Sequence, residues 1–233
     1  MKEMGQIKGV AFDLEGTTVD VERAHHNGFL RTAAEVGLLI TFEQALRQIH
    51  GFVGGGDSVI CAQLSEMCGG KKSVEEIRLR KMVFYREIIA TMDIAPRPGF
   101  LEVFKYLSNR RLGMAIGSLT YKEQAEVLLK RSGVGPLFQD GMIVLREDVK
   151  NPKPAPDVFL ETARRMRIFP SEQLVFEDSP TGVVAAMAAG SMVVAVPVYD
   201  RQEILSALIE AGASKVFLDW KEVYRWVQCE FTD

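Results

Sequence analysis

The stretch VAFDLEGTTVD, residues 10–20, decides the fold, because an apolar run ends abruptly in an acidic turn. The run IKGVAF, residues 7–12, predicts a buried strand. Asp13 comes where that strand stops and Glu15 follows two residues later, so both carboxylates can project beyond its carboxyl end. Ligands of open α/β sheets bind at such ends, although an acidic turn is also a common loop.

The rest of the chain alternates between strand and helix patterns. Further strands are predicted at residues 112–117, 173–178 and 192–198, with weaker candidates at 141–145 and 215–219. Helices are predicted at residues 99–109, 121–132, 156–166, 182–189 and 201–211. Continuous apolar strands that alternate with helices predict a doubly wound α/β core, with a parallel sheet covered on both faces.

Residues 21–94 break this alternation, because helix signals follow one another there without a convincing strand. The signals are two capping boxes, an N-cap and a terminating glycine: Thr41 with Gln44, Ser73 with Glu76, Asp57 and Gly37. We therefore predict a helical cap over residues 20–95, inserted into a core made of residues 1–19 and 96–233. The insert leaves the core just after the first strand, and so emerges over the predicted site.

Composition excludes several classes of protein. The chain has 233 residues, of which 47% are hydrophobic and 25% charged, and its net charge of -3 gives no basic field for nucleic acid. No apolar run approaches the roughly 20 residues of a membrane span, and residues 1–9 lack the apolar block of a signal peptide, so we expect a cytoplasmic protein. Cys61 and Cys68 lie seven apart in a helical pattern, which favours core thiols over metal ligands.

Chemically active side chains also follow the other strands. Ser118 ends the strand at 112–117, Lys153 lies in the loop NPKPAPD, and Glu177 with Asp178 precede the turn SPTG. Taken singly, each has a structural explanation: a helix cap, a solvated charge or the start of a turn. Together, in this order, they place carboxylates, a hydroxyl and an ammonium group on one edge of a parallel sheet.

Four segments carry a family resemblance. FDLEGTTVD (12–20), IGSLT (116–120), KPAPDVF (153–159) and FEDSPTGVVAAMAAG (176–190) resemble, in order and spacing, the motifs of the haloacid-dehalogenase-like hydrolase superfamily. The sequence is most similar to the phosphatase and β-phosphoglucomutase-like branch, which inserts a helical cap just after the first motif. The resemblance covers the core from end to end.

The resemblance implies a role for each of these side chains. Asp13 would be the nucleophile that forms an aspartyl-phosphate. Lys153 would balance the negative charge of nucleophile and phosphate, Ser118 would hydrogen-bond a phosphate oxygen, and Thr17 would support the phosphate pocket.

A magnesium site is implied at the same edge. Mg²⁺ prefers oxygen ligands in an octahedron that retains water. Asp13, the backbone carbonyl of Glu15 and Asp178 would supply these ligands, with Glu177 close by.

Glu15 departs from the family pattern. Most phosphatases of the family carry Asp at this position, as general acid for the leaving oxygen and then as base for the attacking water. The extra methylene of Glu moves the carboxyl by roughly 1 Å, which can cost on the order of a hundredfold in rate. Methionine-salvage enolase-phosphatases carry a similar DxEGTT, but the later motifs follow the phosphoglucomutase branch.

The cap is expected to choose the substrate. By position, His25 and the glycines Gly54 and Gly55 of GFVGGGD match cap residues that face the active site in relatives. Lys81 on the last cap helix could reach a substrate phosphate or sugar, although a solvent-facing helix would look identical. The β-phosphoglucomutases carry Arg where this loop has glycines, which argues against a bisphosphorylated intermediate.

These residues predict a Mg²⁺-dependent phosphatase for a small phosphorylated metabolite, a sugar or polyol phosphate. One alternative is a sugar-phosphate mutase, which shares the core. A carbon–phosphorus hydrolase would need a cap lysine as a Schiff base, and Lys71, Lys72 and Lys81 cannot be placed from sequence. A third alternative is a binding protein in which Glu15 has disabled turnover. The sequence leaves the substrate, the pathway and the oligomeric state open.

Overall fold

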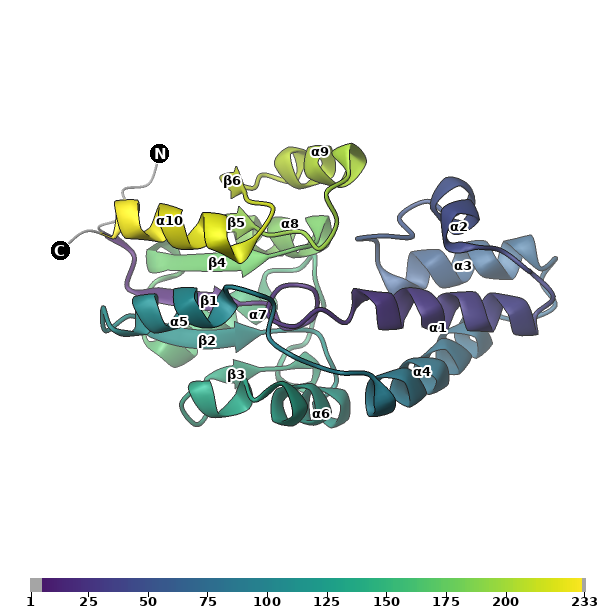
Figure 1. Cartoon of the computed structure of the whole chain (residues 1–233), viewed down its shortest axis with the longest axis horizontal. Coiled ribbons are helices and arrows are strands. Elements are labelled where there is room, and N and C mark those ends of the chain that lie inside the picture. Colours follow the sequence, from purple (N-terminus) through teal and green to yellow (C-terminus); the bar gives the residue numbers. More distant parts are fainter. Residues whose placement is uncertain (1–5, 232–233) are drawn as a thin grey trace. The chain divides into compact units, whose positions relative to one another are not determined.

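The computed structural model describes residues 6–231. The chain forms two compact units (Figure 1): a core unit of residues 6–20 and 94–231, and a helical unit of residues 21–93. The boundaries predicted from the sequence, after residues 19 and 95, and the role of the helical unit as a cap stay predictions.

A parallel sheet forms the centre of the core unit. Its strands are β1 (Gly9–Phe12), β2 (Gly113–Gly117), β3 (Ile143–Val144), β4 (Gln173–Glu177), β5 (Met192–Ala195) and β6 (Lys215–Val216). Their order in the sheet is β3-β2-β1-β4-β5-β6, and every neighbouring pair is parallel. The predicted doubly wound α/β fold is therefore confirmed, and the two weaker sequence runs contain the short edge strands.

Helices cover the sheet on both faces (Figure 1). The longer ones are α5 (Phe100–Ser108), α6 (Lys122–Ser132), α7 (Asp157–Met166), α8 (Pro180–Ala189), α9 (Gln202–Glu210) and α10 (Trp220–Glu230). Helix α10 was not predicted from the sequence, although its signals are present. The Asp219 carboxylate caps the helix by accepting from the Glu222 N–H at 2.8 Å, and Trp220, Val223 and Val227 form its buried stripe.

Alternate residues of the central strands pack into two different apolar clusters, because successive side chains of a strand point to opposite faces of the sheet. On one face Phe12 stacks on Phe176 with ring centroids 5.4 Å apart, and Trp220 of α10 packs against both rings. On the other face Ala11 and Val175 belong to the apolar cluster that α7 and α8 complete. All five side chains are fully buried, so the two central strands are fixed from both sides.

The register of the central strands brings the carboxylates at their ends close together. Phe12 of β1 pairs with Phe176 of β4, and the Asp13 N–H donates to the Phe176 carbonyl at 3.0 Å. The residues that follow, Asp13 just after β1 and Glu177 at the end of β4, therefore lie side by side. The chain runs from β1 outward through β2 and β3 and then returns to β4 on the other side of β1, so this is the point where the strand order reverses.

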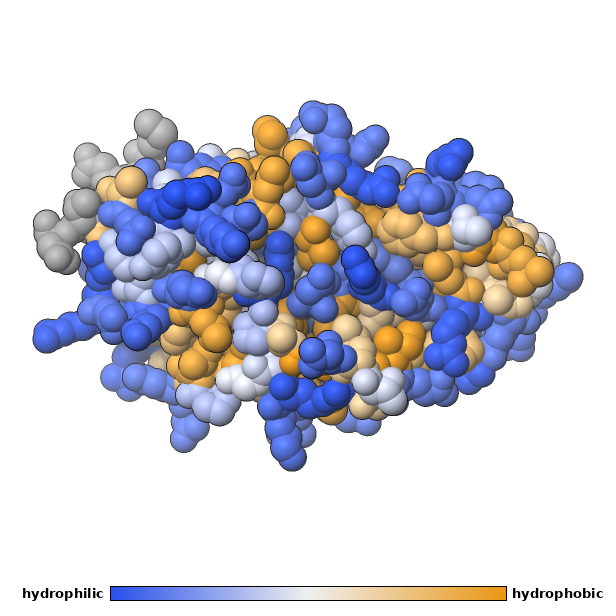
Figure 2. Space-filling model, in the orientation of Figure 1, coloured by the Kyte–Doolittle hydropathy of each residue, from blue (hydrophilic) through white to orange (hydrophobic). Residues whose placement is uncertain are grey.

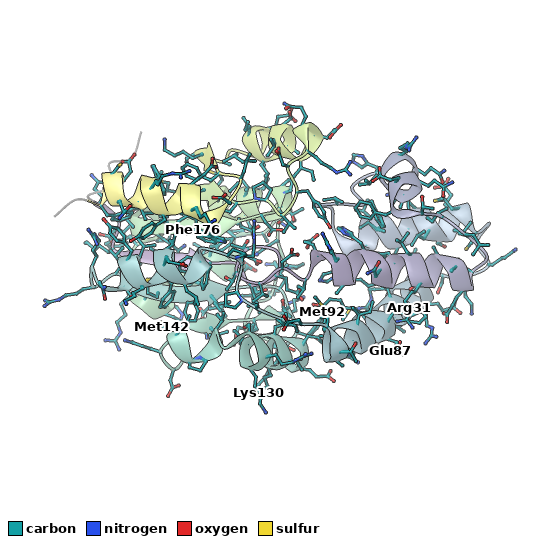
Figure 3. The ribbon with its side chains drawn as sticks, in the orientation of Figure 1. Arg31, Glu87, Met92, Lys130, Met142 and Phe176 are labelled. Carbon is teal, nitrogen blue, oxygen red and sulfur yellow. The ribbon has the colours of Figure 1, made fainter. Side chains whose placement is uncertain are left out.

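The helical unit contains α1 (Glu22–Glu35), α2 (Phe42–Gln48), α3 (Asp57–Met67) and α4 (Val74–Thr91). Arg31 of α1 and Glu87 of α4 form an exposed ion pair at 3.0 Å (Figure 3). Cys61 is fully buried in the apolar cluster of this unit and Cys68 is buried as well, which confirms the expectation of core thiols.

The predicted helix signals of this unit are confirmed with one exception. Both capping boxes are present, at Thr41 and at Ser73, and Gly37 adopts a left-handed φ of 86° just past the end of α1. The assignment of Asp57 as an N-cap is wrong, because Gly56 holds that position and Asp57 is the first helical residue. The Asp57 carboxylate instead accepts a hydrogen bond from a buried lysine, Lys81, at 2.6 Å.

The surface carries both hydrophilic and apolar residues. Figure 2 shows hydrophilic residues spread over the visible face of each unit, with apolar residues interspersed. Within residues 6–231, no helix combines the length and the apolar character that a membrane span requires.

Candidate active site

The turn after β1 is held by its own backbone. The Leu14 carbonyl accepts from the N–H groups of Thr18 and Val19 at 3.1 and 2.9 Å, and the Gly16 N–H donates to the Val19 carbonyl at 2.8 Å. The Thr18 hydroxyl donates to the carbonyl of Asp13 at 2.7 Å. These bonds fix the orientation in which the chain leaves the sheet at Asp13.

Lys153 lies between two carboxylates at this edge. Its ammonium donates to Asp13 Oδ1 at 2.5 Å and to Glu177 Oε1 at 2.6 Å. The side chains of Lys153, Asp13 and Glu177 are only 7%, 9% and 1% exposed, so the interactions are shielded from water. The loop before α7 thus delivers one cation to the ends of both central strands.

Glu177 is held by the start of α8. Its Oε2 accepts from the N–H groups of Asp178 and Ser179 at 2.9 and 3.0 Å, and from the Ser179 hydroxyl at 3.0 Å. A Cβ added at Gly182 would lie 1.8 Å from Glu177 Oε1, so only glycine leaves room for this carboxylate. With both oxygens engaged by the protein, Glu177 is arranged to orient Lys153.

Asp178 lies against the turn that carries Asp13 and Glu15. The Thr17 hydroxyl donates to Asp178 Oδ1 at 3.0 Å. A Cβ added at Gly16 would come within 2.1 Å of Asp178 Oδ2, and Gly16 has a left-handed φ of 81°. This glycine is therefore required twice, for the turn and for the close approach of the carboxylate.

A pair of hydroxyl groups lies where β2 ends. The hydroxyls of Ser118 and Thr120 share a hydrogen bond at 2.9 Å, and the Thr120 N–H donates to Ser118 Oγ at 3.3 Å. Both residues are buried, and β2 pairs in register with β1, so the pair lies on the same edge of the sheet as Asp13. Thr120 was not among the predicted site residues.

Burial shapes the titration of the central pair. Burial raises the pKa of Asp13 to about 8; the charge of Lys153 opposes this rise, and the charges of Glu177 and Glu15 add to it. Burial alone would lower the pKa of Lys153, but its hydrogen-bonded carboxylates more than compensate and raise it above its usual value. Lys153 therefore stays charged, whereas Asp13 is poised to gain or lose a proton near neutrality.

These residues lie within a segment that matches a known family. The family model described as haloacid dehalogenase-like hydrolase matches residues 10–196, which is most of the chain. The chain belongs to the haloacid dehalogenase-like hydrolases.

Individual proteins similar to this chain are consistent with the family match. The protein named Phosphorylated carbohydrates phosphatase from Thermotoga maritima is 28% identical over 207 residues, covering 89% of this chain and 92% of that protein. Fructose-1-phosphate phosphatase YqaB from Escherichia coli is 31% identical over 182 residues, covering 78% of this chain and 92% of that protein. A haloacid dehalogenase-like protein of unknown function from Agrobacterium tumefaciens shares the fold, with a TM-score of 0.81 at 22% identity over 96% of this chain and 98% of that one.

These findings confirm the family resemblance and the expectation of a hydrolase. The predicted roles of the individual site residues stay predictions. The structure brings most of them to one edge of the core sheet: Asp13, Glu15, Thr17, Ser118, Lys153, Glu177 and Asp178. The remaining ones, His25, Gly54, Gly55 and Lys81, belong to the helical unit.

The donor atoms of this hydrolase fit a hard cation. Within residues 6–231, no group of three or more His, Cys, Asp and Glu side chains is arranged to hold a metal ion. Mg²⁺, however, is commonly held by only one or two carboxylates plus water and substrate phosphate. Asp13 and Asp178 supply such carboxylates, and the cradle at Gly16 brings Asp178 to the turn that contains the Glu15 carbonyl.

In the helical unit, Lys81 lies in a compact cluster. Its ammonium donates to Asp57 Oδ2 at 2.6 Å and lies 2.7 Å from His25 Nδ1. The Lys81 side chain is 0% exposed, and its ammonium lies over the ring of Phe29 at 4.7 Å. His25 in turn stacks on Tyr85 with ring centroids 4.2 Å apart. Lys81 therefore has its charge balanced by Asp57.

Gly54 and Gly55 lie in the turn before α3. The Gly55 N–H donates to the Gly51 carbonyl at 3.0 Å, and a Cβ at Gly55 would come within 2.3 Å of the same oxygen. Gly54 has a left-handed φ of 75°. Tight folding of the loop upon itself accounts for both glycines.

Two residues that contact the turn after β1 were not among the predicted site residues. Arg97 donates to the Gly16 carbonyl at 2.6 Å, and the Trp220 indole N–H donates to the Thr17 carbonyl at 3.0 Å. Arg97 lies in the segment PRPG, where no site residue was predicted, and Trp220 begins the helix that was not predicted. Neither contact follows a local pattern, since the partners are 81 and 203 residues apart.

Proposed function

We propose that this protein is a Mg²⁺-dependent phosphatase that hydrolyses a small phosphorylated metabolite, a sugar or polyol phosphate, through an aspartyl-phosphate. The observation that carries the proposal is the position of Lys153, whose ammonium bridges Asp13 and Glu177 at 2.5 and 2.6 Å. A cation in this place holds the nucleophile and faces the charge that phosphoryl transfer develops.

The first step would be an in-line attack on the substrate phosphoryl group. An Asp13 oxygen forms the bond to phosphorus as the bond between phosphorus and the leaving oxygen breaks. Lys153 and the Ser118 hydroxyl would stabilise the negative charge of the transferred group. Glu15 would protonate the leaving oxygen, so that the product departs as an alcohol.

The second step would use the same residues in reverse. Glu15, now ionised, removes a proton from water as the water oxygen attacks the aspartyl-phosphate. Inorganic phosphate leaves and Asp13 is regenerated. Because Asp13 and Lys153 are almost fully buried, their charges act in a medium where they are only weakly screened.

Magnesium would be held by Asp13, Asp178 and the backbone carbonyl of Glu15, and when bound it would neutralise charge on the phosphoryl oxygens. The donor set consists of oxygen atoms throughout, as Mg²⁺ requires. Glu177 is the weakest of the predicted ligands, because the start of α8 and Lys153 already occupy its oxygens.

The substrate class rests on relatives and on charge. Two relatives carry names that refer to phosphorylated carbohydrates and to fructose 1-phosphate. In the helical unit, Asp57 compensates the buried charge of Lys81, so this lysine does not offer a free cation for a second substrate phosphate. Both observations favour a monophosphate whose remainder carries neutral hydroxyl groups. The expected cytoplasmic location stays a prediction.

A panel of phosphate esters, assayed for released inorganic phosphate, tests the proposal. We expect Mg²⁺-dependent release from sugar or polyol phosphates that EDTA suppresses, and an Asp13→Asn variant that is folded but inactive. Full activity in Asp13→Asn would contradict the nucleophile assignment. Isomerised hexose phosphate without free phosphate would indicate a mutase, and activity that appears only in Glu15→Asp would indicate a binding protein.

A further inference from the structure

Arg97 connects three segments of the core unit. It lies on the chain that returns from the helical unit, four residues after Asp93. One guanidinium nitrogen, Nη1, donates to the carbonyls of Gly16 and Val196 at 2.6 and 2.5 Å, and the other, Nη2, donates to the Pro197 carbonyl at 2.9 Å. The turn after β1 and the loop after β5 are thus joined through one side chain.

The backbone of Arg97 reinforces this connection. Its N–H donates to the Thr18 carbonyl at 2.8 Å, next to an antiparallel bridge between Val19 and Pro96. Arg97 therefore donates hydrogen bonds to the turn at two residues, to Gly16 through its side chain and to Thr18 through its main chain. Glu15 is the residue immediately before Gly16.

Other contacts also restrict Gly16, whose carbonyl accepts from Arg97. Gly16 is confined on the side of Asp178 by the 2.1 Å clearance for a Cβ, and its N–H is bonded to the Val19 carbonyl. The Gly16 carbonyl belongs to the peptide that joins Gly16 to Thr17, and the guanidinium fixes its orientation. Glu15 lies one peptide earlier, so a backbone rotation at Gly16 would pass to the Glu15–Gly16 peptide and move the Glu15 carboxyl, which is the end of a long side chain.

We propose that Arg97 is a positioning residue that sets the place of the Glu15 carboxyl for proton transfer. The inference rests on the proposed phosphatase function, in which Glu15 protonates the leaving oxygen. A misplacement of about 1 Å can cost on the order of a hundredfold in rate. Since Glu15 carries one methylene more than Asp, its carboxyl has an additional torsion to control, and a fixed backbone matters more.

Only arginine provides this arrangement. Its planar guanidinium presents several N–H donors at fixed angles, so it can bind carbonyls from two loops at once, whereas the lysine ammonium is a point charge on a flexible stem. Arg97→Lys therefore keeps the charge and removes the geometry.

The test compares two substrates in the same protein preparation. p-Nitrophenyl phosphate has a leaving group that departs without a proton, while the sugar or polyol phosphate that the wild type hydrolyses fastest needs one. General acid catalysis is worth about a hundredfold or more. We expect Arg97→Lys to lower kcat/KM for the sugar or polyol phosphate by about tenfold more than for p-nitrophenyl phosphate. The ratio of the two does not depend on the fraction of folded protein.

Arg165→Lys is the matched control. Arg165 also donates to two main-chain carbonyls, those of Gly141 and Ile143 at 3.0 and 2.8 Å, but these belong to the loop before β3 and to β3 itself. We expect this variant to leave the substrate ratio unchanged. If Arg97→Lys lowers kcat/KM for both substrates by the same factor, so that their ratio is unchanged as in Arg165→Lys, the proposal is overturned.

A double-mutant cycle locates the effect at Glu15. In a Glu15→Gln background the proton donor is already absent, so Arg97→Lys should no longer change the substrate ratio. A ratio that changes as much in this background as in the wild type overturns the proposal. A wild type that hydrolyses none of the substrates overturns the proposed phosphatase function itself, which separates the two failures.

Discussion

Two buried lysines, Lys153 in the core unit and Lys81 in the helical unit, are stabilised in different ways. Lys153 lies between two carboxylates, Asp13 and Glu177. Lys81 contacts one carboxylate, Asp57, together with the imidazole of His25 and aromatic rings. With its carboxylates ionised, the first cluster has an excess of negative charge, whereas the second is balanced.

The difference in net charge indicates what each cluster is arranged to do. Burial of an excess charge is unfavourable unless another partner neutralises it, so the Lys153 cluster is suited to receive a cation with a phosphoryl group. The Lys81 cluster needs no such partner, because its charges compensate each other. Substitutions in the first cluster should therefore affect turnover, and those in the second should affect stability.

The largest expected effect is on turnover. Lys153→Met removes the cation that contacts Asp13 and should lower kcat for p-nitrophenyl phosphate on the order of a thousandfold. The matched variant Lys81→Met should lower it less than about tenfold, since its charge is already balanced. Steady-state kinetics with circular dichroism as a folding control measure both. Equal losses in the two variants would remove the distinction between the clusters.

The next effect concerns the stability of the Lys81 cluster. Asp57→Asn leaves a fully buried ammonium without its carboxylate and should lower the free energy of unfolding by about 3 kcal/mol. Lys81→Met keeps the volume and removes the charge, and the Asp57 side chain left behind is 39% exposed, so its cost should be about 1 kcal/mol. Urea unfolding of both variants measures the difference. A larger loss in Lys81→Met would show that the lysine is held by packing instead of charge.

Much of the first cluster could be predicted from the sequence and little of the second. Asp13, Lys153 and Glu177 follow strands or precede a helix, and parallel strands bring their carboxyl ends to one edge. The pairing of Lys81 with Asp57 depends on how helices of the same unit pack, which local patterns do not specify. Asp57 was interpreted as an N-cap for this reason, since a carboxylate at a helix start is typical of both roles.

The contacts of the turn after β1 were unpredictable for the same physical reason. Arg97 and Trp220 bind main-chain carbonyls, and any residue can provide a carbonyl, so no side-chain type marks the partner. Gly16 and Gly182 were likewise seen only as turn or helix residues. Their need for glycine comes from the carboxylates of Asp178 and Glu177, which approach from other positions in the chain.

The smallest expected effect is a difference in pH dependence between the units. The pKa of Asp13 is raised to about 8, mainly by burial, so between about pH 4 and 8 the folded protein binds a proton that the unfolded chain does not. The pKa of His26 in the helical unit is lowered to about 4, again mainly by burial, so below about pH 6.5 the unfolded chain binds the extra proton. The first group makes stability fall as pH rises, and the second makes it rise.

These opposite slopes can be separated by pH. Between pH 4 and 6.5 the two contributions nearly cancel, but between 6.5 and 8 only Asp13 acts, so the free energy of unfolding of the wild type in EDTA should fall by about 2 kcal/mol. Asp13→Asn should abolish that fall and leave a net rise of stability between pH 4 and 6.5, whereas His26→Gln should extend the fall down to about pH 4. His50→Gln, at an exposed histidine of the same unit, is the control and should change neither slope. A wild-type stability that is flat from pH 6.5 to 8 would mean that Asp13 is already ionised when Lys153 is its neighbour, and that the excess of negative charge is permanent in the folded protein.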